Sequence, residues 1–542
     1  MSVHSFYTPG IENEPIKTYA PGSPERAELK SSIAGMYNEV IDIQAVIGGK
    51  FIREGKKTEV FPPHNFRHLI GHYYNGGAGQ VKMAIEAALK VRSHWNSMSW
   101  EHRASIFLKA ASLLSGPYRT KINAATMIGQ SKTVHQAEID SACEMIDFLR
   151  FNVQFMEDIY INQPLAPLNI WNRIEYRPLE GFIFALTPFN FTSIAGNLPS
   201  APAIMGNTVV WKPSKTQVYS ARVLMEAFME SGLPDGVINM VFAPGPEVSE
   251  VILDHPDFAG IHYTGSTQVF GDIWRKIGAN IRIYKTYPRI VGETGGKGFI
   301  IAHSSASIPH LVTAIIRGAF EYQGQKCSAA SRAYLPASLW PEIKSALEEG
   351  LNTIKMGPPE DFRNFMCAVI DEPSFDKLVG YIERARKDKD AEVIMGGGYD
   401  KSTGYYIQPT IIQVTNPSYF TMSEELFGPI LSVYIYDDNK WEETLDLLDK
   451  TSVYGLTGAL FASDRQIIES ATRTLQYASG NYYINDKPTG AIVGQQPFGG
   501  ARASGTNDKA GSYLNVLRWV SARSIKERFN PPADTCYSEG EE

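Results

Sequence analysis

Two successive runs of alternating strand and helix segments predict an α/β protein built on parallel sheets. The first run covers residues 181–277, and the second begins after residue 297. Strands that are separated by helices pair in parallel, with helices covering both faces of the sheet. A chain of 542 residues also exceeds the size of one hydrophobic core, so we expect two or three domains.

Before the first run, the chain has an irregular arm followed by helices. Residues 1–75 are rich in proline, and only short strands near residues 45–52 are expected there. Apolar residues then recur at helical spacing, and a long helix is predicted over residues 135–159. Three phenylalanines on this helix align with Glu144, whose carboxylate lies either in solvent, the commoner case, or in a cleft. Residues 172–177 predict a strand that is exposed on one face.

The first run also predicts where a ligand binds. Its strands are expected at residues 181–186, 207–211, 237–242 and 259–263. Ligands of such sheets bind outside the carboxyl ends of the strands. Three polar segments follow strands at that edge, at residues 187–191, 211–214 and 264–267.

The second run contains a cysteine with two interpretations. Cys327 lies on a short loop between a predicted helix at residues 308–322 and a predicted strand at 333–335. Small residues follow it, as expected where a thiol is presented at the wall of a cleft and acts as a nucleophile. An inert buried cysteine is the commoner fate of this residue type, and the loop alone favours that alternative. Further on, we expect a glycine-rich loop near the cleft at residues 495–505, an edge strand at 513–520 and a frayed end at 530–542.

The composition excludes several classes of protein. With 43% hydrophobic residues, 20% charged residues and a net charge of −7, the chain has no electrostatic footprint for nucleic acid or an anionic membrane. Its four cysteines are widely scattered, so neither a disulfide scaffold nor a metal site is expected. No apolar run approaches the ~18 residues of a membrane span. We expect a cytoplasmic protein, or one of the mitochondrial matrix if a leader was removed before residue 1.

Six short motifs connect the two runs to a known family. They read TPFNF (187–191), WKPS (211–214), TGST (264–267), ETGGK (293–297), GQKC (324–327) and ELFGP (425–429). In sequence and in order they resemble the aldehyde dehydrogenase superfamily, and the resemblance covers nearly the whole chain. There is no GxGxxG motif, so the usual dinucleotide fingerprint is absent from the sequence.

The resemblance implies the fold and activity of this superfamily. We expect an N-terminal arm and NAD-binding domain (1–164 and 181–295), a catalytic domain (296–506), and an oligomerisation flap with the C-terminal tail (165–180 and 507–542). A homodimer or higher homo-oligomer follows from such a flap. Residues 321–328 and 494–508 most resemble members that oxidise L-glutamate γ-semialdehyde to L-glutamate with NAD, the last step of proline catabolism. Two alternatives stay open: a dehydrogenase for another ω-semialdehyde, and a catalytically silent cofactor-binding member.

The catalytic residues are assigned by the same resemblance. Aldehyde oxidation with a nicotinamide needs a covalent intermediate, because the hydride must leave from a tetrahedral carbon. Cys327 is expected to be the nucleophile, and the Asn190 amide and the Cys327 N–H are expected to stabilise the oxyanion. Glu293 is expected to activate the water that hydrolyses the thioester. Without the family, Asn190 would be read as a turn residue and Glu293 as a solvated loop carboxylate.

The cofactor residues are also implied by the family. They are Lys212, Ser214, Gly265, Ser266, Glu425 and Phe427. Lys212 corresponds to a lysine that binds the adenosine ribose, and Ser266 precedes a helix N-terminus suited to a pyrophosphate. Lys215 replaces a carboxylate found in many members, so we expect NAD as the cofactor, with weaker use of NADP.

The substrate residues complete the set implied by the resemblance. They are Ser328, Gly490, Ala491, Phe191, Phe498 and Glu144. A hydroxyl and two backbone N–H groups, from the first three, would hold the α-carboxylate. The two phenylalanines would flank the aliphatic part, although by themselves they would be assigned to a core. The α-ammonium would stay near water or reach Glu144.

Overall fold

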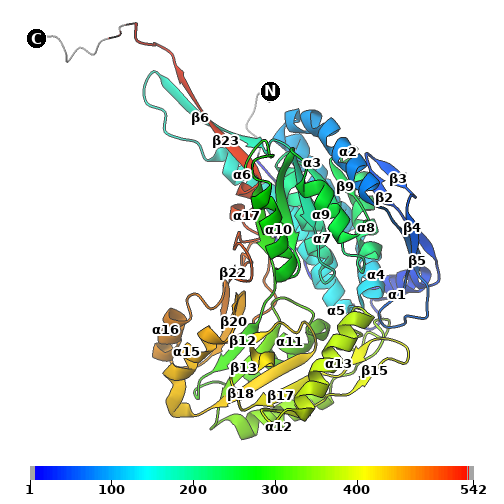
Figure 1. Cartoon of the computed structure of the whole chain (residues 1–542), viewed down its shortest axis with the longest axis vertical. Coiled ribbons are helices and arrows are strands. Elements are labelled where there is room, and N and C mark those ends of the chain that lie inside the picture. The colour runs from blue at the N-terminus through cyan, green and yellow to red at the C-terminus, as the bar shows by residue number, and fades with distance from the viewer. Residues whose placement is uncertain (1–6, 534, 536–542) are drawn as a thin grey trace, which may run out of the picture.

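The computed structural model describes residues 7–533 and 535. Two seven-stranded sheets covered by helices form the upper and lower parts of the molecule, and a two-stranded ribbon projects from the upper part (Figure 1). The predicted α/β class is confirmed. Among residues 7–533, no helix is both long and apolar enough to cross a membrane.

The upper sheet has the strand order β11-β10-β7-β8-β9-β2-β3. Its first five strands are parallel, whereas β2 and β3 pair antiparallel at the edge. The strands are β7 (Phe182–Leu186), β8 (Thr208–Lys212), β9 (Ile238–Met240), β10 (Phe258–Thr264), β11 (Arg289–Glu293), β2 (Ala45–Ile47) and β3 (Lys50–Ile52). Almost every side chain of β7, β8 and β10 is buried, as expected for strands covered on both faces.

Helices cover both faces of the upper sheet. One apolar cluster joins its strands to α2 (Ala78–Ser97), α9 (Gly245–Leu253) and α10 (Thr267–Ala279). The other cluster joins them to α3 (Trp100–Ser115), α4 (Arg119–Gln130), α6 (Met145–Ile161), α7 (Thr192–Ile204) and α8 (Val218–Glu230). The long helix predicted over residues 135–159 is present, as α5 (Val134–Ala137), a π-helical segment (Glu138–Glu144) and α6.

The lower sheet has the order β14-β17-β18-β13-β12-β20-β21, and only β14 runs antiparallel. Its strands are β12 (Gly298–Ala302), β13 (Ala330–Pro336), β14 (Ala391–Met395), β17 (Thr410–Val414), β18 (Ile430–Tyr436), β20 (Thr457–Phe461) and β21 (Asn481–Ile484). On one face pack α11 (Ile308–Phe320) and α12 (Trp340–Asn352). On the other pack α13 (Glu372–Lys387), α15 (Trp441–Thr451) and α16 (Arg465–Thr474).

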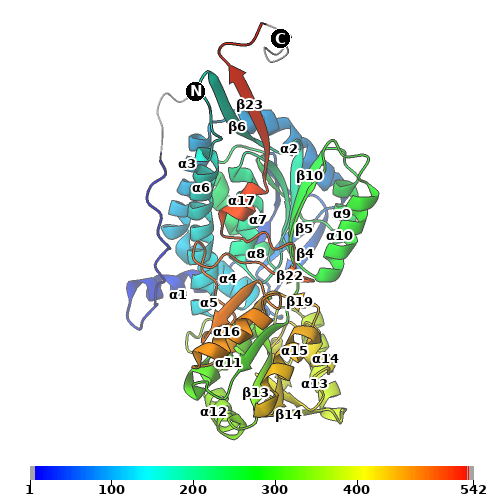
Figure 2. The same cartoon turned by 90° about the vertical axis from the view of Figure 1, so that its left-hand side faces the viewer.

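The projecting ribbon joins two segments that are far apart in sequence. Strand β6 (Ile170–Pro178) pairs antiparallel with β23 (Val520–Arg528) over nine residue pairs. The strand predicted at residues 172–177 lies inside β6. Figure 2 shows the ribbon standing clear of the helical body. Most of its residues are partly buried or exposed. Only its base packs on the body among the described residues, where Val520 is buried and Tyr176 stacks on Tyr160 of α6.

Two local predictions were wrong. The arm is not irregular throughout, because it contains α1 (Pro24–Tyr37). The N-cap of this helix is Ser23, whose Oγ accepts a hydrogen bond from Arg26 N. The arm also forms a small sheet from β1 (Ile41–Ile43), β5 (Gly71–Asn75) and β4 (Lys56–Val60).

The second wrong prediction concerns the edge strand at residues 513–520. This segment instead begins with helix α17 (Tyr513–Leu517), and strand β23 starts only at Val520. Val516, Trp519 and Val520 are all buried, and their spacing of three and four fits a helical turn better than a strand. Of the predicted frayed end, residues 534 and 536–542 lie outside the described residues.

Candidate active site

The loop that carries Cys327 is fixed from both sides. After α11 the chain makes a 3-10 turn (Glu321–Gly324) in which Gln323 has a φ of 56°, an uncommon conformation for this residue type. The buried Gln323 Nε2 donates to Ser131 O (3.1 Å) and to Ala368 O (2.8 Å). These bonds tie the turn to both parts of the molecule, so the position of the partly exposed Cys327 is set by the fold.

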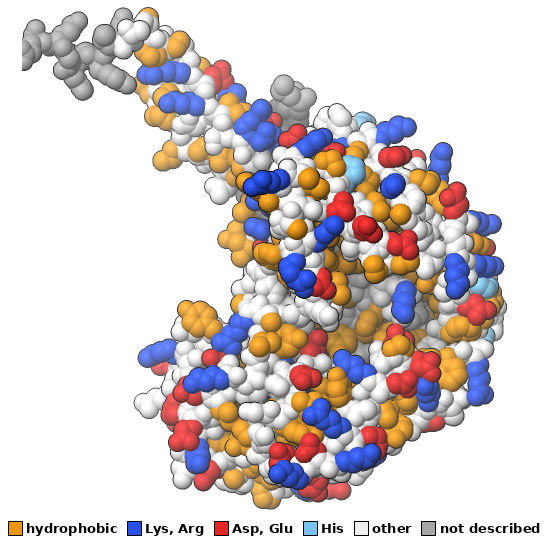
Figure 3. All heavy atoms as spheres, in the orientation of Figure 1, with side chains coloured by type: hydrophobic (Ala, Val, Ile, Leu, Met, Phe, Trp, Pro, Cys, Tyr) orange, Lys and Arg blue, Asp and Glu red, His pale blue; other side chains and the backbone are white. Residues whose placement is uncertain are grey.

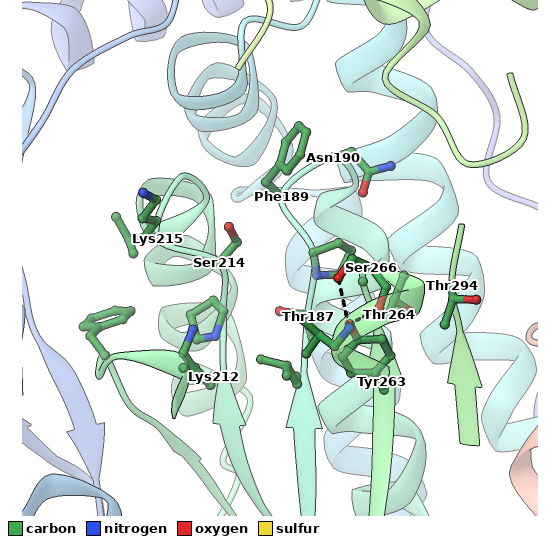
Figure 4. Close-up of a pocket in the computed structure, with 18 of the residues that line it drawn as sticks. Thr187, Phe189, Asn190, Lys212, Ser214, Lys215, Tyr263, Thr264, Ser266 and Thr294 are labelled. Carbon is green, nitrogen blue, oxygen red and sulfur yellow. Dashed lines mark hydrogen bonds between the residues drawn. The ribbon is translucent and has the colours of Figure 1, made fainter. Parts of the chain in front are cut away.

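Cys327 opens into a cavity of about 490 Å³ between the upper and lower parts. Figure 3 shows the surface hollowed between these parts. All predicted cofactor residues line the same cavity, together with Cys327 and Asn190: Lys212, Ser214, Gly265, Ser266, Glu425 and Phe427. In Figure 4, Lys212, Ser214 and Lys215 lie on one side, and Tyr263, Thr264 and Ser266 lie across from them.

Lys212 is the last residue of β8 and therefore lies at the carboxyl edge of the upper sheet. Burial, together with the nearby positive charge of Lys215, lowers its pKa to about 8. No carboxylate within the described residues forms an ion pair with Lys212. A largely buried ammonium without an acidic partner is suited to bind ligand oxygens.

The turn after β10 presents a helix N-terminus to the cavity. Ser266 is the N-cap of α10, and its Oγ accepts a hydrogen bond from Val269 N (3.4 Å). The Tyr263 hydroxyl donates to Ser266 O (2.8 Å), which fixes the turn (Figure 4). A side chain at Gly265 would come within 2.5 Å of the Tyr263 hydroxyl oxygen, so only glycine fits. The unsatisfied N–H groups of this helix end favour an anion.

The lower part closes the cavity from the opposite side. Glu425 Oε1 accepts a hydrogen bond from Gly296 N (2.8 Å), and burial raises the pKa of this carboxyl group. Phe427 has a φ of 61°, and its ring meets the ring of Phe189 edge-on at 5.8 Å. These two side chains therefore hold fixed positions beside Cys327.

Asn190 lies against the nucleophile loop. Its side chain is buried, and its Nδ2 donates to Gln325 O at 3.1 Å. Because Asn190 and Cys327 line the same cavity, the amide is placed where it can also donate to an oxygen on a carbon attached to the thiol.

Glu293 ends β11, at the same sheet edge as Lys212. It does not line the cavity, but its Oε2 is buried and has no hydrogen-bond partner among the described residues. Burial raises the pKa of Glu293 well above its ordinary value. Burial also raises the pKa of Cys327, and the Glu293 carboxylate adds to that shift. The structure therefore places a thiol near a carboxyl group, and burial raises the pKa of both groups.

The predicted substrate residues do not line the cavity. Ser328 is buried beside Cys327, and its carbonyl accepts a hydrogen bond from Thr457 (3.2 Å). The N–H groups of Gly490 and Ala491 have no acceptor within the part of the chain that the structure describes. Phe498 is partly buried and exchanges backbone hydrogen bonds with Ala510.

The last two predicted substrate residues, Phe191 and Glu144, also lie outside the cavity. Glu144 ends the π-helical segment and is partly buried, so it does not lie in open solvent as the commoner case would have it. Burial, together with the nearby Asp140 carboxylate, raises its pKa to about 8. Phe191 is the N-cap residue of α7.

Comparisons with known proteins identify the family. The model of the aldehyde dehydrogenase family matches residues 51–522. The chain belongs to this family. It is 51% identical to a Delta-1-pyrroline-5-carboxylate dehydrogenase of Dictyostelium discoideum named as mitochondrial, over 97% of this chain and 95% of the relative. It is 45% identical to the human protein of that name, over 97% and 94% of the two chains.

A solved structure agrees with this assignment. The Delta-pyrroline-5-carboxylate dehydrogenase from Mycobacterium tuberculosis bound with NAD superimposes with a TM-score of 0.96. The two chains are 50% identical, and 99% of each is covered. The predicted aldehyde dehydrogenase fold is confirmed.

The sequence analysis does not identify Lys132, a buried residue of this aldehyde dehydrogenase that contacts a predicted substrate residue and the turn before Cys327. Lys132 is fully buried and pairs with Asp140 at 2.6 Å. Its Nζ lies 4.2 Å from the ring centre of Phe191 and 4.4 Å from that of Tyr322. Such cation–π contacts fix both rings, one at a predicted substrate residue and one in the nucleophile turn. Nothing in the sequence around Lys132 signals this role.

Proposed function

We propose that this chain is an NAD-dependent dehydrogenase that oxidises L-glutamate γ-semialdehyde, the hydrolysed form of Δ1-pyrroline-5-carboxylate, to L-glutamate in proline catabolism. The observation that carries the proposal is that Cys327 opens into one cavity with Asn190 and every predicted cofactor residue. Full-length similarity to proteins named for this substrate supports the choice of semialdehyde.

The chemistry divides between three side chains. The Cys327 thiol loses its proton to water, and the thiolate attacks the aldehyde carbon. The Asn190 amide and the Cys327 N–H donate to the resulting oxyanion. NAD, when bound, accepts the hydride that leaves this carbon, and a thioester remains on Cys327. Glu293 takes a proton from water, the water attacks the thioester, and the C–S bond breaks to release the acid.

The cavity residues fit the parts of NAD. The Lys212 ammonium is suited to the adenosine ribose hydroxyls, and the N-terminus of α10 at Ser266 is suited to the pyrophosphate. Glu425 and Phe427 would hold the nicotinamide ribose and ring beside Cys327. NADP is used more weakly, with Lys215 near the ribose.

The Ser328 hydroxyl and the N–H groups of Gly490 and Ala491 would donate hydrogen bonds to the substrate's carboxylate. Support comes from those two N–H groups, which have no acceptor in the described part of the chain. Phe191 and Phe498 would enclose the aliphatic portion. Glu144 or water would satisfy the ammonium, and the high pKa of Glu144 favours a carboxyl group that ionises when a cation arrives.

The two sheets would belong to domains with different functions. Residues 1–164 and 181–295 would form the N-terminal arm and the NAD-binding domain, and residues 296–506 would form the catalytic domain that carries the nucleophile. Residues 165–180 and 507–542 would form the oligomerisation flap and the C-terminal tail. The flap would join two or more copies, because it projects from the body (Figure 1) and because it exposes apolar side chains. Leu165 is 93% exposed, Trp171 51% and Phe529 63%.

We assign the enzyme to a reducing compartment, because Cys143, Cys327 and Cys367 are all free thiols. The cytoplasm is our choice. The mitochondrial matrix is the alternative, and subcellular fractionation distinguishes the two.

A panel assay tests the proposed function. NADH production should be measured from glutamate γ-semialdehyde, shorter and longer ω-semialdehydes, and butanal. We expect the highest kcat/KM with glutamate γ-semialdehyde. A higher value for another semialdehyde would assign the chain to that substrate. If no aldehyde gives NADH and no substrate protects Cys327 from thiol labelling, the chain is a silent family member.

A further inference from the structure

The segment before α1 lies against the loop that is predicted to bind the substrate carboxylate. Asn13 Nδ2 donates to Val493 O at 2.9 Å. In return, Gln495 Nε2 donates to Asn13 Oδ1 at 2.8 Å. One amide thus uses its donor and its acceptor on a single turn that is 480 residues away in sequence.

Asn13 is itself a fixed point on the helical body. Its Nδ2 also donates to Asp147 Oδ2 (2.8 Å), and the next residue donates its N–H to Asp147 Oδ1 (2.7 Å). The Glu14 carboxylate forms ion pairs with Arg119 of α4 and Arg150 of α6. Both helices are packed in the main apolar cluster, so the amide of Asn13 is held by rigid elements.

The turn at residues 490–496 makes few other hydrogen bonds to the rest of the chain, and Val493 is its one buried side chain. Inside the turn, Ile492 N donates to Gln496 Oε1, and the N–H groups of Gln495 and Gln496 donate to Ile492 O. Among the described residues, only Asn13 and Gly511 form hydrogen bonds with the turn from outside it. The bond to Gly511 is donated by Gly494 N to Gly511 O, at 3.3 Å. Two of these three bonds therefore involve Asn13.

The beginning of this turn carries Gly490 and Ala491, whose N–H groups have no acceptor among the described residues. Gly490 has a φ of 93°, and Gln495 and Gln496 are exposed at the surface. Without an outside restraint, such an exposed turn would sample several orientations of its N–H groups. A pair of donors that must meet a carboxylate gains affinity when its orientation is fixed beforehand.

We propose that Asn13 is a positioning residue, which holds the turn at residues 490–496 so that the Gly490 and Ala491 N–H groups face the substrate carboxylate. The inference rests on the proposed function, because it concerns how that substrate is held. Asn13 acts through the turn and touches no reacting atom.

Kinetics of an Asn13→Ala variant test the proposal. Loss of the paired hydrogen bonds should raise KM for glutamate γ-semialdehyde about 5- to 20-fold. The values of kcat, of KM for NAD and of kcat/KM for butanal should not change, because none of them depends on carboxylate binding. Amide hydrogen exchange in residues 490–496 should accelerate. Gln495→Ala should reproduce both effects, and the double variant should add little to either single one.

Thr8→Ala is the matched control. Thr8 lies in the same segment but bonds to Gln154 and Glu157 of α6, and it does not touch the turn. This variant should keep the wild-type KM and exchange rates.

Three results would overturn the positioning role. The first is an unchanged KM and an unchanged exchange rate in both Asn13→Ala and Gln495→Ala. The second is a loss of kcat/KM with butanal equal to the loss with glutamate γ-semialdehyde. The third is a rise in KM and in exchange rate in Thr8→Ala equal to that in Asn13→Ala. A wild-type enzyme that prefers another aldehyde would refute the proposed function instead, and hydrogen exchange would still decide whether Asn13 holds the turn.

Discussion

The two seven-stranded sheets face the active-site cavity with opposite edges. The upper sheet contributes residues at the carboxyl ends of its strands: Lys212 ends β8, Ser266 follows β10, and Glu293 ends β11. The lower sheet contributes residues before its strands begin, with Cys327 ahead of β13 and Phe427 ahead of β18.

This difference has an electrostatic consequence. At the carboxyl edge of a parallel sheet the following helices begin, so their N-termini favour a pyrophosphate. At the amino edge the preceding helices end, as α11 does before the nucleophile loop. Cys327 therefore gains no stabilisation of its thiolate from a helix N-terminus, and its pKa is raised, not lowered. One edge is therefore suited to the anions of a cofactor, and at the other edge burial raises the pKa of the thiol.

Removal of the nucleophile should have the largest effect. Cys327→Ala should lower turnover by about four orders of magnitude or more and should give no burst of NADH, because no thioester can form. The residues at the carboxyl edge are untouched, so NAD binding measured by calorimetry should persist. Loss of NAD binding would show that the two edges do not work independently.

Removal of the oxyanion donor should come next. Asn190→Ala should lower kcat by about 10²–10³-fold, which is the usual cost of one such donor. Because Asn190 also bonds to Gln325 O, thermal unfolding should be measured alongside. A kcat close to wild type would exclude the side chain from the oxyanion site.

Substrate recognition should show a smaller and selective effect. Ser328→Ala should lower kcat/KM for glutamate γ-semialdehyde about 10-fold and leave butanal oxidation nearly unchanged, because only the former leaves a carboxylate unsatisfied. In the wild type, the preference over butanal should exceed the roughly 10–200-fold that one methylene can give. Equal losses on both aldehydes would mean that Ser328 only shapes the nucleophile loop.

The cofactor edge should give an effect no larger than that of Ser328→Ala. Lys215→Glu should depress kcat/KM with NADP by about 10-fold and with NAD by less, since a carboxylate repels a 2′-phosphate. Lys215 lines the cavity three residues after Lys212. Equal losses with both cofactors would show that Lys215 does not face the 2′ position.

The two edges also differ in how far the sequence predicts them. Strand and helix periodicity alone placed Lys212 and Ser266 at a ligand-binding edge, because the carboxyl ends of parallel strands follow a general rule. No such rule covers the amino edge. By periodicity alone Cys327 was better read as an inert cysteine, and only the family motifs reversed that reading.

Other features escaped prediction for specific reasons. Helix α1 begins with a recognisable signal, a serine N-cap followed by proline. The other prolines of the arm outweigh this signal, because proline-rich segments are usually irregular. Residues 513–520 alternate enough to predict an edge strand, although the buried Val516, Trp519 and Val520 are spaced for a helical turn. The contact between Asn13 and Gln495 joins two loops 482 residues apart and follows no periodicity. Contacts of this kind emerge only when the whole chain has folded.

The central claim is that Glu293, from the carboxyl edge of one sheet, completes a reaction begun by Cys327 at the amino edge of the other. Rapid mixing of Glu293→Gln with NAD and glutamate γ-semialdehyde tests it most directly. We predict a burst of about one NADH per active site, followed by slow turnover, because hydride transfer precedes the step that needs the base. Steady-state turnover at the wild-type rate, without a burst, would contradict the account.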